Sequence, residues 1–175
     1  FDTLKIVVED ANAACGLLGK QIEVIGYDTR GDATEAVNAV KRHTSQDKVV
    51  AILGPNASGQ AISISGVLEQ MKVANIATVA TNPKVTVNDD GSVKPYNFRV
   101  CFIDPYQGAV AAGYAADKLS FTKAAILYDV TSDYSQGLTE FFEKTFTEKG
   151  GTIVAKEGFK AGDVDFRAQL SKIKE

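Results

Sequence analysis

Hydrophobic residues recur along this chain with two different periods, and the two periods alternate. In residues 3–14, Leu4, Val7 and Val8 return at the three- and four-residue spacing of an amphipathic helix. In residues 21–27, apolar and polar side chains alternate as they do in a half-buried strand. The same reasoning predicts helices from Asp32 or Thr34 to about residue 43, over 58–68, 104–118 and 135–149, and after residues 163–165. It predicts strands or extended segments over residues 49–53, 73–81, 97–103, 123–129 and 152–155.

This alternation of strands and helices is typical of the α/β class, in which helices cover a parallel sheet on both faces. We therefore expect a three-layer αβα architecture. Residues 82–96 form a long connection with a tight turn, and such loops are often functional or mark a boundary. Residues 97–104 read as a joint between two strand–helix runs, which indicates two lobes.

The most informative stretch runs from Val49 to beyond Ser58. Five apolar residues predict a strand buried on both faces, and Gly54-Pro55-Asn56 ends it. Ser58 stands at the start of the next helix, where a serine can act as the N-cap. The same position lies at the carboxyl end of a strand, where open α/β sheets bind ligands and where helix starts favour anions. Ser58 is thus either a helix cap or a ligand contact.

Composition narrows the function classes. The chain has 175 residues, of which 45% are hydrophobic and 23% charged, with a net charge of -3, so nucleic acid and anionic membranes are poor partners. It has no apolar run near the roughly 20 residues that span a bilayer. The first residues do not resemble a signal peptide, although a mature secreted protein would look the same.

The chemistry-bearing residues do not suggest an enzyme or a metal centre. His43 is the one histidine, and it lies on the polar side of a helical run, where we expect a solvated side chain. Cys15 and Cys101 could pair in principle, but their spacing does not require it, and two separate thiols is the favoured interpretation. No glycine-rich nucleotide fingerprint occurs. We expect no cofactor, no metal and no catalytic residue.

The order of short motifs resembles the type I periplasmic binding proteins of branched-chain and hydrophobic amino-acid uptake systems. In the first half, the matching pieces are Asp10-Ala-Asn12-Ala-Ala-Cys-Gly-Leu-Leu-Gly19, Tyr27-Asp28, Ile52-Leu-Gly-Pro-Asn-Ala-Ser58 and Val79-Ala-Thr81-Asn-Pro83. They continue with Asn97-Phe-Arg-Val-Cys-Phe-Ile-Asp104-Pro-Tyr-Gln-Gly108, Ile126-Leu-Tyr-Asp129, Asp133-Tyr134-Ser-Gln-Gly137 and Gly162-Asp-Val-Asp165-Phe166. Each piece alone is weak, but their common order covers nearly the whole chain.

The resemblance implies two lobes, residues 1–103 and 104–175, that close on an amino acid and deliver it to an ABC transporter permease. It implies a periplasmic protein, or a lipid-anchored extracellular one in a Gram-positive source. By the same resemblance, the carboxylate and ammonium of the ligand contact Ser58 and the Val79-Ala80-Thr81 segment. Asp104 either orients the ammonium or caps its helix, and Tyr134 either reaches the cleft or is an ordinary half-buried loop tyrosine.

The chain departs from the family pattern in two ways. Cys15-Gly16 stands where the family has two glycines, so we expect Gly16 alone to adopt the left-handed conformation. The chain also opens and closes on a helix, so the first strand and the C-terminal half of the fold are expected to be missing. A complementing chain or self-association would then cover the exposed sheet edges and faces. The alternative functions are a flavodoxin-like single domain and a receptor ectodomain with the same fold.

Overall fold

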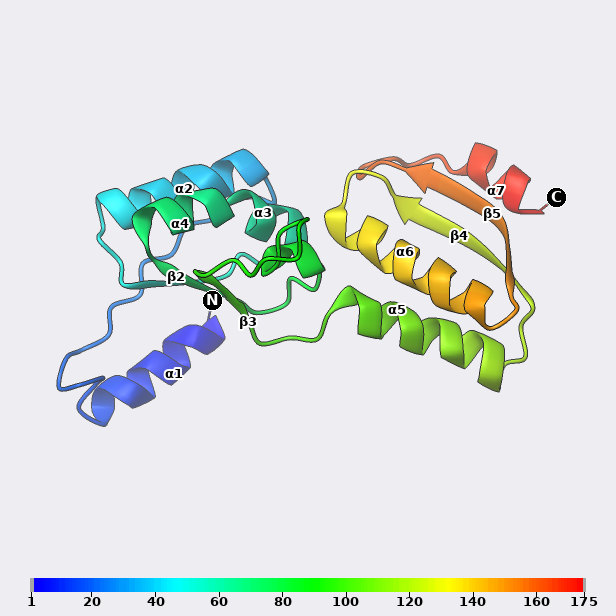
Figure 1. Ribbon diagram of the computed structural model, residues 1–175. Coiled ribbons are helices and arrows are strands. Elements are labelled where there is room, and N and C mark those ends of the chain that lie inside the picture. Colours follow the sequence, from blue (N-terminus) through cyan, green and yellow to red (C-terminus); the bar gives the residue numbers. More distant parts are fainter. Residues whose placement is uncertain (1, 175) are drawn as a thin grey trace. The chain divides into compact units, whose positions relative to one another are not determined.

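The computed structural model describes residues 2–174, and the chain divides into two compact units, Phe1–Arg30 and Gly31–Glu175. Helix α1, Asp2–Ala13, is the main element of the first unit (Figure 1). Its bounds confirm the helix that the apolar spacing predicts over residues 3–14.

The end of α1 differs from expectation at Cys15. The Gly16 amide donates to the Ala11 carbonyl at 2.8 Å and the Cys15 amide to the Asn12 carbonyl at 3.2 Å, which is the Schellman pattern. Both Cys15 (φ 77°) and Gly16 (φ 70°) are left-handed, so the prediction that Gly16 alone adopts this conformation is wrong. A Cβ on Gly16 would lie 2.0 Å from the Lys20 carbonyl oxygen, so only glycine fits there.

Residues 21–27 form no strand, so that prediction is wrong. A strand forms only when its backbone pairs with another strand, and the described part of this unit contains no strand with which residues 21–27 could pair. At Ile22, the Asn12 side chain forms the two backbone hydrogen bonds that a neighbouring strand would form. Its Oδ1 accepts from the Ile22 amide at 2.7 Å, and its Nδ2 donates to the Ile22 carbonyl at 2.9 Å. Ile25 and Tyr27 remain more than 40% exposed.

The second unit contains two separate parallel sheets. The first has the order β1-β2-β3, formed by Ala51–Leu53, Ala74–Ala77 and Asn97–Arg99. Its helices are α2, Ala33–Ser45, α3, Ser58–Ser63, and α4, Ser65–Met71, and a short 3₁₀ helix η1, Pro83–Val85, follows β2. Figure 1 shows α2, α3 and α4 together on one side of this sheet. Asp32 caps α2 by accepting a hydrogen bond from the Glu35 amide at 2.8 Å, which confirms one of its two predicted caps.

The two faces of this sheet differ in burial. On the helix-covered face, Ile52 packs against a cluster built on Ala36, Val40, Ile64 and Leu68. On the other face, Leu53, Ile76 and Phe98 stand in register across the three strands and are 36–51% exposed. The prediction that residues 49–53 are buried on both faces is therefore wrong, because helices of this unit cover only one face.

The second sheet pairs β4, Lys123–Asp129, with β5, Thr152–Phe159. Helix α5, Asp104–Gly113, continues into a π-helical turn η2, Tyr114–Lys118, and α6, Asp133–Glu148, and α7, Arg167–Lys174, complete the unit. Figure 1 shows α5 and α6 on one side of the strand pair and α7 on the other. Helices α5 and α6 approach closely at Gly108, where a Cβ would lie 2.8 Å from the Cβ of Phe141.

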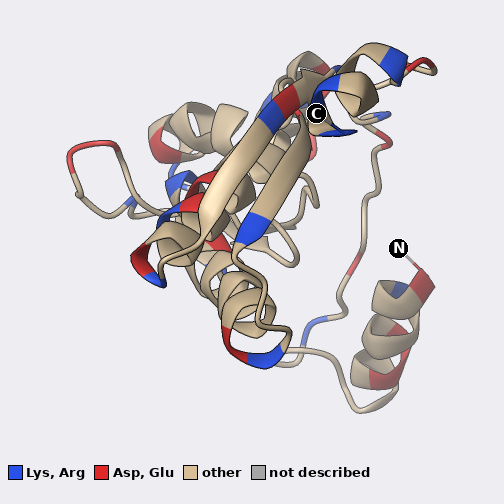
Figure 2. Cartoon of the chain, turned by 90° about the vertical axis from the view of Figure 1, so that its right-hand side faces the viewer, with Lys and Arg blue, Asp and Glu red and all other residues tan. Residues whose placement is uncertain are grey.

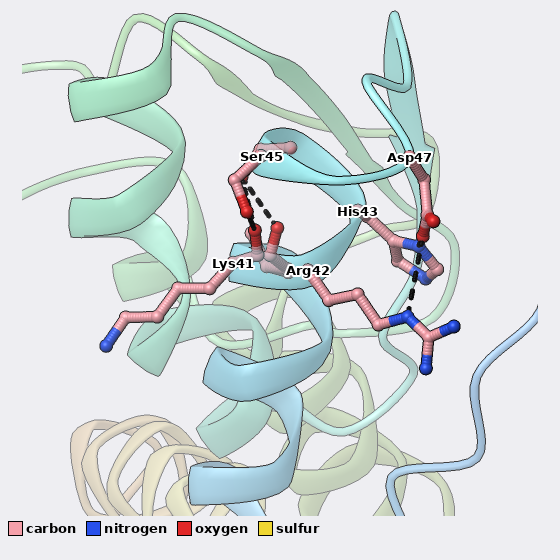
Figure 3. A network of polar contacts seen from close by, with 7 residues as sticks. Lys41, Arg42, His43, Ser45 and Asp47 are labelled. Atoms are coloured by element: carbon pink, nitrogen blue, oxygen red, sulfur yellow. Dashed lines mark hydrogen bonds and ion pairs between the residues drawn. The ribbon is translucent and has the colours of Figure 1, made fainter.

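The C-terminal turn of α2 holds a small polar network (Figure 3). His43 is 9% exposed, and its Nδ1 lies 2.8 Å from Asp47 Oδ2, which also lies 3.9 Å from Arg42 Nε. The expectation of a solvated His43 is wrong, because the buried stripe of α2 runs through Ala36, Ala39 and Val40 to this residue.

The charged residues are dispersed. Figure 2 shows Lys and Arg mixed with Asp and Glu on the helices and loops in view. Among the described residues, no helix is long and apolar enough to cross a membrane. Residues 2–174 also contain no group of three or more His, Cys, Asp or Glu placed to hold a metal ion. Both cysteines are free; Cys15 is exposed and Cys101 half-buried.

Candidate functional site

A cavity of about 470 Å³ lies in the second unit, where the carboxyl ends of strands from both sheets face the starts of helices. Segments after β1, β2 and β4 line it, together with the first residues of α2. The residues that matter for its chemistry are Asn56, Ser58, Gly59, Val79, Asp133 and Tyr134. The wall therefore combines a larger apolar part with a few polar side chains.

Ser58 lines this cavity but does not cap its helix. It is the first residue of α3, whose N-cap is Ala57, and no side chain caps the helix. Ser58 Oγ instead accepts a hydrogen bond from the Asn82 amide at 3.3 Å. The capping interpretation of Ser58 is wrong. Because a hydroxyl is both a donor and an acceptor, Ser58 can still donate its own proton to a ligand.

The segment Val79-Ala80-Thr81 passes directly beside Ser58, as the Ser58–Asn82 hydrogen bond shows. Val79 is 57% exposed and lines the cavity. Ala80 and Thr81 are 1% and 5% exposed and do not line the cavity, whereas Ser58 lines it although it is itself only 3% exposed. The structure thus brings Ser58 and Thr81 close together, but in this arrangement only Ser58 and Val79 reach the cavity.

Arg99 on β3 holds this segment in place. Its Nη1 donates to the carbonyls of Ala80 at 3.1 Å and Asn82 at 2.7 Å, and its Nη2 to Thr86 Oγ1 at 2.9 Å. Such multiple donation from one rigid guanidinium fixes backbone geometry well.

Asp104 is fully buried and outside the cavity wall. Its helix begins with Ile103 as N-cap and no side-chain cap, so the capping role predicted for Asp104 is wrong. Among residues 2–174, neither carboxyl oxygen has a hydrogen-bond partner, and neither does Thr81 Oγ1. Burial raises the pKa of Asp104, and the nearby Thr81 hydroxyl and Arg99 guanidinium offset this rise only in part.

Tyr134 is the second residue of α6, is 39% exposed and lines the cavity. Its hydroxyl accepts a hydrogen bond from Gln107 Nε2 of α5 at 3.0 Å. The ring therefore faces the cavity from the second sheet's side, while Ser58 and Val79 face it from the first sheet's side.

Sequence reasoning missed Asn56 and Asp133 as cavity residues. Both follow strands at their carboxyl ends, so the rule that selects Ser58 would also have selected them. Asn56 Oδ1 accepts from Thr78 Oγ1 at 2.9 Å, and the Asp133 carbonyl accepts from Asn82 Nδ2 at 2.8 Å.

Parallel strands that lead into helices, with a cavity at their carboxyl ends, are the arrangement in which α/β proteins generally bind small molecules. The chain belongs to the periplasmic binding protein family, whose sequence profile matches residues 2–175. This confirms the resemblance that the ordered motifs indicate, and with it the incomplete type I α/β fold.

Two curated relatives illustrate the match. The chain is 32% identical over 166 residues to an amino acid binding protein of Pseudomonas aeruginosa, covering 95% of this chain and 43% of that protein. It is also 32% identical over 172 residues to Leu/Ile/Val-binding protein homolog 2 of Brucella abortus, covering 98% and 45%. The chain thus spans less than half the length of these relatives.

Solved structures agree with the sequence relatives. A leucine-binding protein of Thermotoga maritima has a TM-score of 0.86 and 38% identity, covering 95% of this chain and 46% of that one. The branched-chain amino acid transporter substrate-binding protein of Streptococcus pneumoniae, solved with isoleucine, has a TM-score of 0.86 and 35% identity, covering 97% and 47%.

Proposed function

We propose that this protein is the solute-binding component of an ABC uptake system and binds a small neutral or branched-chain amino acid. The observation that carries the proposal is the cavity at the strand ends, lined by Ser58 from the first sheet's side and Tyr134 from the second's. The names of the relatives, which refer to amino acids and to leucine, isoleucine and valine, support the same ligand class.

Each predicted site residue has a place in this proposal. The Ser58 hydroxyl donates to the ligand carboxylate, because hydroxyl donors suit an anion. Val79 and the Tyr134 ring provide apolar contact. Ala80, Thr81 and Asp104 lie below the wall in this arrangement, so their contact with a ligand requires the cleft to rearrange.

Such a rearrangement fits a two-lobed protein. The lobes of the proposal are residues 1–103 and 104–175, and the joint between them adjoins Asp104. Hinge closure is driven by contacts that exist only in the closed state. The exposed row Leu53, Ile76 and Phe98 is an apolar face that further polypeptide, either a complementing chain or a second copy, would cover.

The proposal also covers partners and location. The protein would pass its ligand to a permease in the membrane without catalysing a reaction, and would act in the periplasm or, lipid-anchored, outside the cell. A receptor ectodomain shares this fold and would differ by attachment to a signalling module.

The test is isothermal titration calorimetry of the protein against a panel of amino acids. We expect leucine, isoleucine, valine or another neutral amino acid to bind with a dissociation constant in the low micromolar range or below, about −8 kcal/mol. Absence of binding across the panel would overturn the proposed function.

A further inference from the structure

The side chain of Asn82 connects the first sheet's side of the molecule to a helix on the second sheet's side. Asn82 is 7% exposed and is the N-cap of η1, where its Oδ1 accepts from the Lys84 amide at 2.9 Å. Its Nδ2 donates to the main-chain carbonyl of Asp133, the first residue of α6, at 2.8 Å. The two bonds fix the orientation of the side-chain amide, because a flipped amide would oppose donor to donor and acceptor to acceptor.

The main chain of Asn82 is anchored on the first sheet's side. Its carbonyl accepts from Arg99 Nη1 of β3 at 2.7 Å, and its amide donates to Ser58 Oγ of α3 at 3.3 Å. All four polar groups of Asn82 are thus bonded, and three of these bonds lead to α3, η1 and β3. These elements hold Asn82 in place, and its Nδ2 reaches across to α6.

A glycine allows α6 to approach Asn82 this closely. Gly137 lies four residues after Asp133 and therefore on the same face of α6. A Cβ on Gly137 would lie 2.9 Å from Asn82 Nδ2 and 2.7 Å from Asp104 Oδ2, so any larger residue would force these groups apart. The face of α6 thus offers Asn82 a carbonyl to bind and leaves room for its side chain.

We propose that Asn82 is a positioning residue that couples occupation of the cavity to the approach of the two lobes. This inference rests on the proposed function, in which the ligand contacts Ser58. A hydroxyl that accepts one hydrogen bond is a stronger donor of the next, so the Asn82 amide strengthens the bond from Ser58 to the ligand. The same residue holds Asp133, and it does not itself line the cavity. We call the bond from Asn82 Nδ2 to the Asp133 carbonyl the clasp.

The clasp affects ligand affinity through the equilibrium between open and closed lobes. The bond exists only while α6 lies close to Asn82, so it stabilises the closed arrangement. Its loss lowers the population of closed protein, and the apparent affinity for each ligand falls in proportion to that population. The clasp therefore changes affinity without changing ligand preference, unlike a residue that touches the ligand.

Two variants break the clasp from opposite sides. Asn82→Ser keeps an oxygen that can cap η1, but its side chain is too short to reach Asp133. Gly137→Ala keeps Asn82 and adds a methyl group that would collide with its Nδ2. Gly66→Ala is the control, because it brings the same gain in helix propensity within α4, and a Cβ there would have nothing within 4 Å.

The separation of the lobes is measured by double electron–electron resonance between two spin labels. The labels are attached at Gln70→Cys of α4 and Glu148→Cys of α6, both exposed, after Cys15 and Cys101 are replaced by serine. We expect both clasp variants to give a longer or broader distance distribution than the wild type. The Gly66→Ala protein should give the wild-type distribution.

Calorimetry then tests the coupling to the cavity, with the two amino acids of the panel that bind the wild type most tightly. Both clasp variants should bind each of them about 2- to 10-fold more weakly, since one hydrogen bond is lost. The ratio of the two affinities should equal that of the wild type. The Gly66→Ala protein should keep both affinities.

The outcomes separate this inference from the proposed function. If both clasp variants keep the wild-type distance distribution or the wild-type affinities, the inference is overturned, while the proposed function stands. A loss of affinity for one amino acid alone would also overturn it, because the variants would then act on ligand contacts. If the wild-type protein binds no amino acid in the panel, the proposed function fails and the coupling fails with it, even where the distances show that Asn82 holds the lobes together.

Discussion

At the scale of single residues, position relative to a strand end is more informative than residue type. Ser58 and Asp104 both stand at helix starts, and both could have been ordinary caps. In the structure neither is a cap: Ser58 lines a cavity, and Asp104 is buried without a hydrogen-bond partner among the described residues. Both sit where strands end, which is where α/β sheets bind ligands.

Ser58→Ala should weaken ligand binding by roughly 1–3 kcal/mol, because a hydroxyl donor to the ligand carboxylate is removed. Calorimetric titration of the best amino-acid ligand measures the change. Ser63→Ala is the matched control. Ser63 belongs to the same helix but does not line the cavity, and its hydroxyl donates to the Gln60 carbonyl at 2.8 Å. Equal affinity of the Ser58→Ala protein and the wild type would remove Ser58 from the site.

At the scale of elements, the end of α1 holds a non-glycine residue in a left-handed backbone conformation. Cys15 takes the left-handed position of the Schellman motif that ends α1, a position that glycine usually occupies. The neighbouring Gly16 is also needed as glycine, because a Cβ there would collide with the Lys20 carbonyl. The strain therefore stays at Cys15.

Cys15→Gly should stabilise α1 by about 0.5–1 kcal/mol. Removal of a left-handed non-glycine residue gains roughly 1–2 kcal/mol, and the flexibility of glycine in the unfolded chain offsets about 0.5–1 kcal/mol of this. Hydrogen exchange of the α1 amides measures the effect within the first unit. Ala14→Gly is the control: Ala14 is not left-handed, so this change should speed exchange. Faster exchange in the Cys15→Gly protein would contradict the prediction.

At the scale of the whole molecule, the joint after β3 buries the carboxyl group of Asp104 completely. Asp104 starts α5, and its carboxyl lies against α6: a Cβ on Gly137 would be 2.7 Å from Asp104 Oδ2. The burial that raises its pKa is thus produced by packing of a helix from the second sheet's side against the end of the first. The folded protein therefore disfavours the ionised form of Asp104.

Asp104→Asn should raise the free energy of unfolding at neutral pH by about 1–2 kcal/mol, because an unpaired buried carboxylate is replaced by a neutral amide. The pKa of Asp104 is higher in the folded protein than the unfolded reference of 3.8, so ionisation destabilises the fold. The gain should therefore shrink as the pH falls through the folded-state pKa toward 3.8. Urea unfolding of both proteins over a pH series measures it, and a gain independent of pH would show that Asp104 is not the cause.

The sequence by itself determined the element order, the α/β class and the family. Strand β4 and helix α6 lie where the periodic pattern predicts them, because their own apolar spacing is sufficient to define them. Residues 21–27 have an equally regular pattern but form no strand, because a strand needs a partner that local sequence does not supply.

Only the tertiary structure decided which of the predicted site residues reach the cavity. The family resemblance predicts Ser58, Val79, Ala80, Thr81, Asp104 and Tyr134 together as ligand contacts and gives no means of ranking them. The structure places Ser58, Val79 and Tyr134 on one cavity and leaves Ala80, Thr81 and Asp104 off its wall. Whether a side chain lines a cavity depends on which other segments of the fold surround it, and those segments are distant in the chain.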